Sequence, residues 1–542
     1  MNAALRKEIR LILPAWIVAL VAAAIPVWLM GSGVQQLNYY PQGNATIWHG
    51  LSLLNGQIQM MHIVSLVLFS AGALLLALAS FGLEMSFGTF PSLLAQPCPR
   101  LQIWSMKVGV LAAALVSVAA VAAVSWCLRL HMVHSEFLEM ARGWHAGFQS
   151  NRPLDLNQMY AEFARGWYER VQPPPLMDHI QCILLLAVLA FAGGLWTTLL
   201  LRQIVTAFWF AIVVPWVLFV FSPFLKMPSE GISASFNNGL LAMMTLGYGV
   251  VGYCLARWLF LHAQDKQAQE ATNVVAWSFL PAFSKARRPV PVAALLVKEL
   301  RLQQGTLAIA PVLVLLHLAA MAAPGYFPHA LASSYSSFAY IWMVWWMAPL
   351  LVGCASVAEE RRGQTLQNIL CLPVERIIQF TIKLLVVFGL GLFLGAVMPW
   401  WLERLAPAGD LDHNMVTDLG LSGLLLTAAI TTGIGCYASS LSGTFLQAIG
   451  ATVGLVLASG ILLASFPFVV DVFRSDLKHL SWPVLIATCF LLSYANFKQL
   501  RITWRQWLRN GLILLAAMFG PSALMLSLGL STDWLARHIY FQ

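Results

Sequence analysis

The chain has 542 residues, of which 59% are hydrophobic and only 10% are charged, and its formal net charge is +9. Soluble globular proteins carry about 25% charged residues, so this composition excludes that class. Its apolar runs are roughly 20 residues long, the length that a helix needs to cross about 30 Å of hydrocarbon. The composition therefore predicts an all-α polytopic membrane protein.

The apolar runs follow one another in chain order as candidate membrane spans. They are 11–31, 62–82, 105–127, 180–201, 204–224, 238–260, 305–324, 338–357, 384–402, 418–438, 445–467, 482–496 and 511–530. The first run is too long for the apolar part of a signal peptide, and we interpret it as a span. This order predicts two tandem repeats of six transmembrane helices plus an extra C-terminal span, which makes 12–13 spans.

The predicted domains follow from these runs. Residues 1–261 form the first six-span unit, in which 129–179 is an outer helical segment. A cytoplasmic linker at 262–297 leads to the second six-span unit at 298–509, and the extra span and tail occupy 510–542.

The strongest motif in the chain is a polar stretch that occurs twice. Residues 84–107, here called the first copy, match residues 360–383, the second copy, at a constant offset of 276. The pairs are Glu84 and Glu360, Thr89 and Thr365, Leu93 and Ile369, Pro97 and Pro373, Arg100 and Arg376, and Lys107 and Lys383. Gly88 misses its counterpart Gly363 by one place. Apolar residues at i, i+3 and i+4 predict a short amphipathic helix in each copy, ended by a proline.

A second short motif is also repeated, ahead of the first span of each half. We refer to the two repeated motifs as words. Lys7-Glu8-Ile9-Arg10 precedes the run at 11–31, and Lys298-Glu299-Leu300-Arg301 precedes the run at 305–324. Two repeated words in the same order indicate an internal duplication.

The basic residues predict the orientation. With a cytoplasmic N-terminus, most Lys and Arg residues fall in the inner segments, as expected of a multi-pass protein of a bacterial inner membrane. Both copies then face the cytoplasm. Anionic membrane lipid accounts for the excess of positive charge, so no nucleic-acid partner is predicted.

These repeated words resemble those of type-2 exporter permeases of ATP-binding-cassette (ABC) transporters. In that family the element between spans two and three is a coupling helix that docks on a soluble ATPase subunit. The resemblance implies that Glu84, Gly88, Thr89, Pro97, Arg100 and Lys107, with Glu360, Thr365, Pro373, Arg376 and Lys383, lie at the ATPase contact. It also places Lys7, Glu8, Lys298 and Glu299 on a short cytoplasmic helix before each unit.

Two departures qualify the resemblance. Most such permeases are single six-span chains that dimerise, whereas here both units are fused, which predicts one copy of this chain per transporter. The second copy also reads Gly363-Gln364-Thr365 where the first has Gly88-Thr89, so the two sides could differ.

The nucleotide chemistry is expected on a partner. The chain has no GxxxxGK[ST] motif, so we expect that it is not an enzyme, has no catalytic residues and binds no cofactor or metal. ATP and Mg²⁺ would sit on soluble ABC ATPase subunits, two of them for two coupling elements.

Other functions stay open at this point. A secondary carrier or channel without an ATPase is the main alternative, although few ionisable residues fall inside the spans. A membrane-embedded transferase is the second. The charge-poor spans favour an amphipathic or lipid-like cargo. His317 lies inside an apolar run and is more simply explained by a bond to a neighbouring helix. Gly391-x-x-x-Gly395 and Gly450-x-x-x-Gly454 would allow close helix approach.

Overall fold

We describe the fold from a computed structural model. The residues described are 3–29, 44–147, 176–221, 234–263, 291–326, 335–362, 367, 371, 374–405, 415–465, 478–499 and 503–527. Residues Thr365 and Pro373, most of the predicted linker and the predicted outer residues 148–175 lie outside these ranges.

The described residues form helices and no strand, which confirms the all-α class. The helices of the first half are α1 (Ala3–Leu29), α2 (Asn44–Ser86), α3 (Phe90–Leu94), α4 (Arg100–Gly147), α6 (Leu176–Leu201), α7 (Ile204–Phe221) and α8 (Ala234–Leu261). Those of the second half are α10 (Pro291–Leu302), α11 (Gln304–Tyr326), α13 (Tyr335–Arg362), α15 (Arg376–Leu392), the π-helix η5 (Phe393–Val397), α16 (Met398–Arg404), α17 (Met415–Leu441), α18 (Phe445–Ser465), α20 (Lys478–Phe497) and α21 (Trp504–Ser527).

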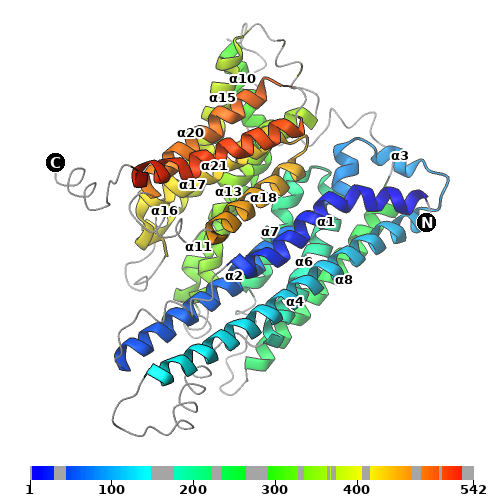
Figure 1. Ribbon diagram of the computed structural model, residues 1–542. Helices are drawn as coiled ribbons and strands as arrows, with labels where there is room; N and C mark the ends of the chain where they lie inside the picture. The colour runs from blue at the N-terminus through cyan, green and yellow to red at the C-terminus, as the bar shows by residue number, and fades with distance from the viewer. Residues whose placement is uncertain are drawn as a thin grey trace. The chain divides into compact units, whose positions relative to one another are not determined.

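Long apolar helices dominate the described part of the chain (Figure 1). Seven of them are long and apolar enough to cross a membrane, or eight if the bent pair α10 and α11 counts as one span. The described part of every apolar run predicted from the sequence is helical, and the run 384–402 is divided over α15, η5 and α16. The polytopic membrane class is therefore confirmed, while the 12–13 spans and the two six-helix repeats remain predictions.

The chain forms two compact units. The first contains Met1–Ala77, Ser105–Ala192 and Val453–Phe466, and the second contains Leu78–Trp104, Gly193–Thr452 and Pro467–Gln542. The predicted domain boundaries at 261, 297 and 509 are not tested by this grouping and remain predictions.

Small residues and one aromatic cluster hold the first unit together. A Cβ on Gly72 of α2 would lie 3.0 Å from the Cα of Ala19, so α1 and α2 are in close contact here. At another point the Nδ1 atoms of His62 and His179 lie 2.8 Å apart, and Trp126 stacks on His179 at 4.1 Å. These side chains join α2, α4 and α6, and the histidine contact requires that one ring donates its proton to the other.

Close glycine contacts organise the second unit. Gly353 of α13 faces Gly435 of α17, and a Cβ on either would lie 2.7 Å from a carbonyl oxygen of the other helix. The predicted close approach at Gly391 and Gly395 is confirmed, because a Cβ there would lie 2.2 Å from Thr432 Oγ1 or 2.6 Å from Pro349 Cγ. For Gly454, which belongs to the first unit, the prediction was wrong, since no atom of the described residues lies within 4 Å of the added Cβ. Glycine spacing alone does not tell which face of a helix is packed.

The histidine inside an apolar run has a partner on a neighbouring helix. Trp345 Nε1 of α13 donates a hydrogen bond of 3.3 Å to His317 Nδ1 of α11, and His317 is buried. The hypothesis of a neutral histidine bonded to another helix is therefore confirmed.

The two halves begin differently. In the second half Lys298 and Glu299 lie on a separate helix, α10, which is bent by 57° from α11. In the first half Lys7 and Glu8 lie within α1, which continues without a break into the first span. The predicted separate short helix is therefore present only in the second half, where the chain breaks at Gln303. The side-chain nitrogen Nε2 of Gln303 donates a hydrogen bond to the carbonyl oxygen of Val352.

Candidate functional site

The first half contains a buried ion pair that joins the two repeated words. Lys107 Nζ of α4 lies 2.6 Å from Glu8 Oε2 of α1, and the two side chains are 1% and 2% exposed. Taking two charges out of water is costly, and the pair is tolerated because each charge compensates the other. The ion pair therefore links α1 to α4, and removing one of its partners would destabilise the fold because the other charge would stay buried.

The second half contains the corresponding pair within a larger cluster. Lys383 Nζ of α15 lies 2.7 Å from Glu299 Oε2 of α10 and 2.9 Å from Glu360 Oε1 of α13. Lys298, which is one third exposed, contacts both carboxylates as well. Two carboxylates and two ammonium groups thus meet where three helices converge.

The charges in this cluster support one another. Glu299 lies on α10, before the predicted span at 305–324. Burial alone would raise the pKa of Glu299, but the ammonium groups of Lys383 and Lys298 outweigh it and lower the pKa. The carboxylate therefore stays ionised at neutral pH.

The two ion pairs are made by residues at matching positions of the sequence repeat. Lys107 and Lys383 end the two copies, while Glu8 and Glu299 stand in the two Lys-Glu words. The structure brings each lysine to the glutamate of its own half, which is 99 residues away in the chain for Lys107 and 84 for Lys383. Sequence reasoning found these four residues but did not predict that they pair.

An arginine holds the end of the sixth predicted span of each half, which is α8 in the first and α20 in the second. Arg100 Nη1 of α4 donates to the carbonyl oxygens of Leu261 and Ala263, at 2.8 and 2.9 Å, where α8 ends. Arg361 Nη2 of α13 donates to those of Asn496 and Gln499, at 3.0 and 3.1 Å, where α20 ends. The last carbonyls of a helix lack intrahelical partners and carry partial negative charge, so a guanidinium is well suited to this position.

Arg361 was not among the site residues predicted from the sequence. Arg376 is the counterpart of Arg100 in the repeat, yet it is exposed at the start of α15. Arg361 instead binds the helix-end carbonyls, as Arg100 does in the first half, although it lies near the start of the second copy. Burial lowers the pKa of Arg361 to about 10, which leaves it protonated at neutral pH. A basic residue four positions after the predicted span at 338–357 was the available signal.

Replacing either capping arginine should destabilise the fold. We expect Arg100→Gln and Arg361→Gln each to cost about 1.5–3 kcal/mol, since each removes charged hydrogen bonds to helix-end carbonyls. Exposed Arg376→Gln loses the same charge and is the matched control, expected to change stability by less than about 0.5 kcal/mol. Thermal unfolding in detergent measures all three. Equal melting temperatures for Arg100→Gln and Arg376→Gln would rule out the capping role.

Both copies also pack on matching apolar clusters. In the first, the rings of Phe81, Trp104 and Phe260 have centroids 5.5–5.7 Å apart. In the second, Val357, Phe380 and Phe497 form a buried cluster. Phe81 and Val357, like Trp104 and Phe380, stand at the same offset of 276 as the repeated words. The similarity of the halves thus extends beyond the polar residues.

Gly88 sets the turn that follows α2. Its φ is +66°, a value that residues with a Cβ rarely adopt. The Gly88 nitrogen bonds to the carbonyl oxygen of Met85, and the Thr89 nitrogen bonds to that of Glu84. This is the hydrogen-bond pattern of a Schellman helix end, in which glycine is the usual residue. The first motif glycine therefore has a local structural role.

The predicted short helix of the first copy is present as α3. Its N-terminal flank is Thr89, Pro91 occupies the first turn, and Phe90 and Leu93 are buried as the apolar spacing predicted. The helix ends at Leu94, ahead of Pro97. Of the corresponding residues 366–370 of the second copy, only Gln367 lies within the described ranges, so this helix remains a prediction there.

The first copy has a buried and an exposed side. Glu84 is 1% exposed and Lys107 is also buried, and Glu360 and Lys383 of the second copy are buried too. Ahead of α4, the exposed residues of the first copy lie in its turn, on α3 and between α3 and α4, and we call them the exposed turn: Phe87, Gly88, Thr89, Ser92, Ala95, Gln96, Pro97, Cys98 and Pro99. Phe87 is the largest of them and is 55% exposed. The motif thus divides into residues that hold the element and residues that a partner could reach.

Within the described residues, no group of three or more His, Cys, Asp or Glu side chains could hold a metal ion. The fold and the buried ion pairs define a polytopic helical membrane protein with the same charged contact in both halves. No family model, characterised protein or solved structure matches the chain.

Proposed function

We propose that this chain is the permease subunit of an ATP-driven ABC exporter. Two six-span units would form the translocation pathway, with an amphipathic or lipid-like cargo. The observation that carries the proposal is the repeated ion pair, Glu8 with Lys107 and Glu299 with Lys383. In each half this ion pair joins the lysine that ends the copy to the first helix of that half.

The ion pairs suit a force-transmitting role. The exposed turn leads directly into α4, which begins at Arg100 and carries Lys107 two turns later. A movement of the exposed turn would therefore move α4. The buried bond from Lys107 to Glu8 passes the movement on to α1. Because packed helices shift as rigid elements, such a linkage would move spans instead of deforming the loop.

The exposed turn is the proposed docking surface for a soluble ATPase. Phe87 is a large apolar side chain that a partner can bury, and aromatic residues contribute strongly to binding energy. The buried residues Glu84 and Lys107, at the two ends of the first copy, would hold this surface in position, and Glu360 and Lys383 would do the same for the second copy. With the N-terminus in the cytoplasm, as the basic residues favour, this surface faces the ATPase.

Co-purification tests this proposal. Tagged protein would be extracted in mild detergent, and proteins that carry a P-loop would be identified in the eluate. We expect an ABC ATPase with the wild type and at least tenfold less with Phe87→Asp, which places a charge at the centre of the docking surface. Glu84→Lys is unsuitable, because a buried charge reversal confuses lost docking with misfolding.

Thr503→Asp is the matched control. Thr503 is exposed and precedes α21 in another predicted cytoplasmic segment, and the change adds the same charge there. It should retain the ATPase, and gel filtration should show that both variants are folded. If no P-loop protein accompanies the wild type, the ATP-driven mechanism is rejected. If Phe87→Asp retains the ATPase fully, docking on the exposed turn is rejected.

A further inference from the structure

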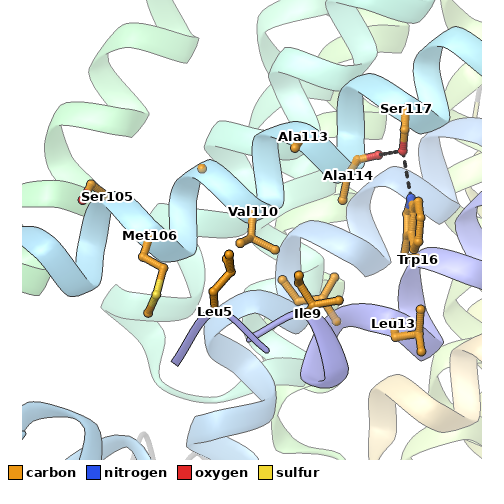
Figure 2. Close-up of a pocket in the computed structure, with 12 residues that line it drawn as sticks. Leu5, Ile9, Leu13, Trp16, Ser105, Met106, Val110, Ala113, Ala114 and Ser117 are labelled. Atoms are coloured by element: carbon orange, nitrogen blue, oxygen red, sulfur yellow. Dashed lines mark hydrogen bonds between the residues drawn. The ribbon is translucent and has the colours of Figure 1, made fainter. Parts of the chain in front are cut away.

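An open apolar groove runs between α1 and α4 in the first unit (Figure 2). Its volume is about 550 Å³. The α1 side is formed by large apolar residues that recur about once per helical turn, namely Leu5, Ile9, Ile12, Leu13 and Trp16. The groove lies beside the ion pair of Glu8 and Lys107, which joins the same two helices.

Small residues on α4 leave the space for this groove. Ser105, Gly109, Ala113 and Ser117 follow one another at intervals of four, which places them in one row along the helix. A Cβ on Gly109 would meet no atom within 4 Å, so this position opens into free space. A larger side chain in the row would fill the groove.

At the end of the groove formed by Trp16 and Ser117, the polar side chains are hydrogen-bonded within the protein. Trp16 Nε1 donates to Ser117 Oγ at 2.9 Å, and Ser117 Oγ donates to the carbonyl oxygen of Ala114 at 2.6 Å, as Figure 2 shows. The donors of both polar side chains are therefore paired within the protein, and the surface left to an occupant at this end is apolar. Such a surface favours a hydrocarbon chain.

Two positively charged residues lie on the N-terminal turns of α1, the helix that forms one side of the groove. Arg6 and Arg10 are both exposed. Each stands three residues before a lining residue, Ile9 or Leu13, and so lies on the neighbouring part of the helix surface. The N-terminal part of α1 therefore carries two guanidinium groups close to the lining residues in the chain, and guanidinium binds phosphate well.

The length of the groove matches one lipid chain. Twelve residues separate Ser105 from Ser117, which corresponds to roughly 18 Å along a helix. Half of a bilayer's hydrocarbon core is roughly 15 Å thick. One acyl chain that extends from a headgroup at the membrane surface would span most of the groove.

We propose that this groove binds one acyl chain of an anionic phospholipid, whose phosphate headgroup lies beside Arg6 and Arg10. The apolar walls hold the chain, and the two arginines select a negatively charged headgroup over a zwitterionic one. This lipid site is independent of the exposed turn and of any ATPase.

Native mass spectrometry of the delipidated protein tests the site. Phosphatidylglycerol and phosphatidylcholine with identical acyl chains would be titrated separately. We expect the wild type to bind phosphatidylglycerol more tightly. Arg6→Gln and Arg10→Gln should each weaken it about fivefold, because each basic residue contributes about that factor at an anionic surface. The loss for phosphatidylcholine should be clearly smaller, because its choline group offsets the negative charge of its phosphate.

Filling the groove gives the second arm of the experiment. Gly109→Leu should abolish the tight binding of both lipids, since its side chain occupies the place of the acyl chain. Gly247→Leu is the matched control, because Gly247 is an exposed helical glycine on α8 with equally free space around it. Equal lipid binding by the two leucine variants would overturn the site. Equal affinity of the wild type for the two lipids would overturn the headgroup assignment.

Discussion

Lys383→Met is expected to destabilise the protein by about 3–5 kcal/mol, the cost of removing one partner from a buried ion pair. Lys383 lies within 3 Å of oxygen atoms of both Glu299 and Glu360, and all three side chains are at most 4% exposed. Its loss leaves two buried carboxylates with a less complete countercharge. Chemical unfolding of the purified protein in detergent micelles measures this loss.

Lys298→Met is the control within the same cluster. Lys298 is one third exposed, so its ion pairs are partly screened by solvent and its removal leaves Lys383 in place. We expect a distinctly smaller effect. If both methionine variants unfold at the same denaturant concentration, Lys383 is not the centre of the cluster.

The first-half pair allows a double-mutant cycle. Lys107→Met alone leaves the carboxylate of Glu8 buried without its countercharge and should be severely destabilising. Adding Glu8→Gln removes that charge as well, and the double variant should recover much of the lost stability. Strict additivity of the two single effects would mean that the pair does not couple α1 to α4.

Gly353→Ala and Gly435→Ala form the second prediction with a large effect. The added Cβ would lie 2.7 Å from a backbone oxygen of the facing helix, and that oxygen cannot rotate away as a side chain would. Helices α13 and α17 must separate, and overpacking of this kind costs about 1–3 kcal/mol. The expected result is a lower melting temperature for each variant.

Gly454→Ala is the matched control for this contact. Gly454 lies in α18, and no atom lies within 4 Å of its added Cβ. Since alanine favours a helix over glycine by about 1 kcal/mol, this variant should be neutral or slightly more stable. A loss of stability as large as that of Gly353→Ala would show that the glycine effect is not specific to the α13–α17 contact.

The local elements were well predicted from the sequence. The apolar runs all fall on helices, because a segment in lipid must satisfy its backbone groups internally. The turn at Gly88 and the helix at Phe90–Leu94 also follow from local chemistry, since glycine allows positive φ and proline favours a first helical turn. These features depend on residues close together in the chain.

The pattern of the sequence by itself thus determined the class of protein, the positions of its helices and the duplicated charged words. Tertiary structure alone decided that Lys107 pairs with Glu8, that Arg361 takes the place of Arg376, and that Gly391 is packed while Gly454 is not. The physical reason is that hydropathy and backbone bonding act within one helix. Partners of a buried charge depend on how neighbouring helices rotate and how closely they approach, which is set by packing across residues far apart in the chain.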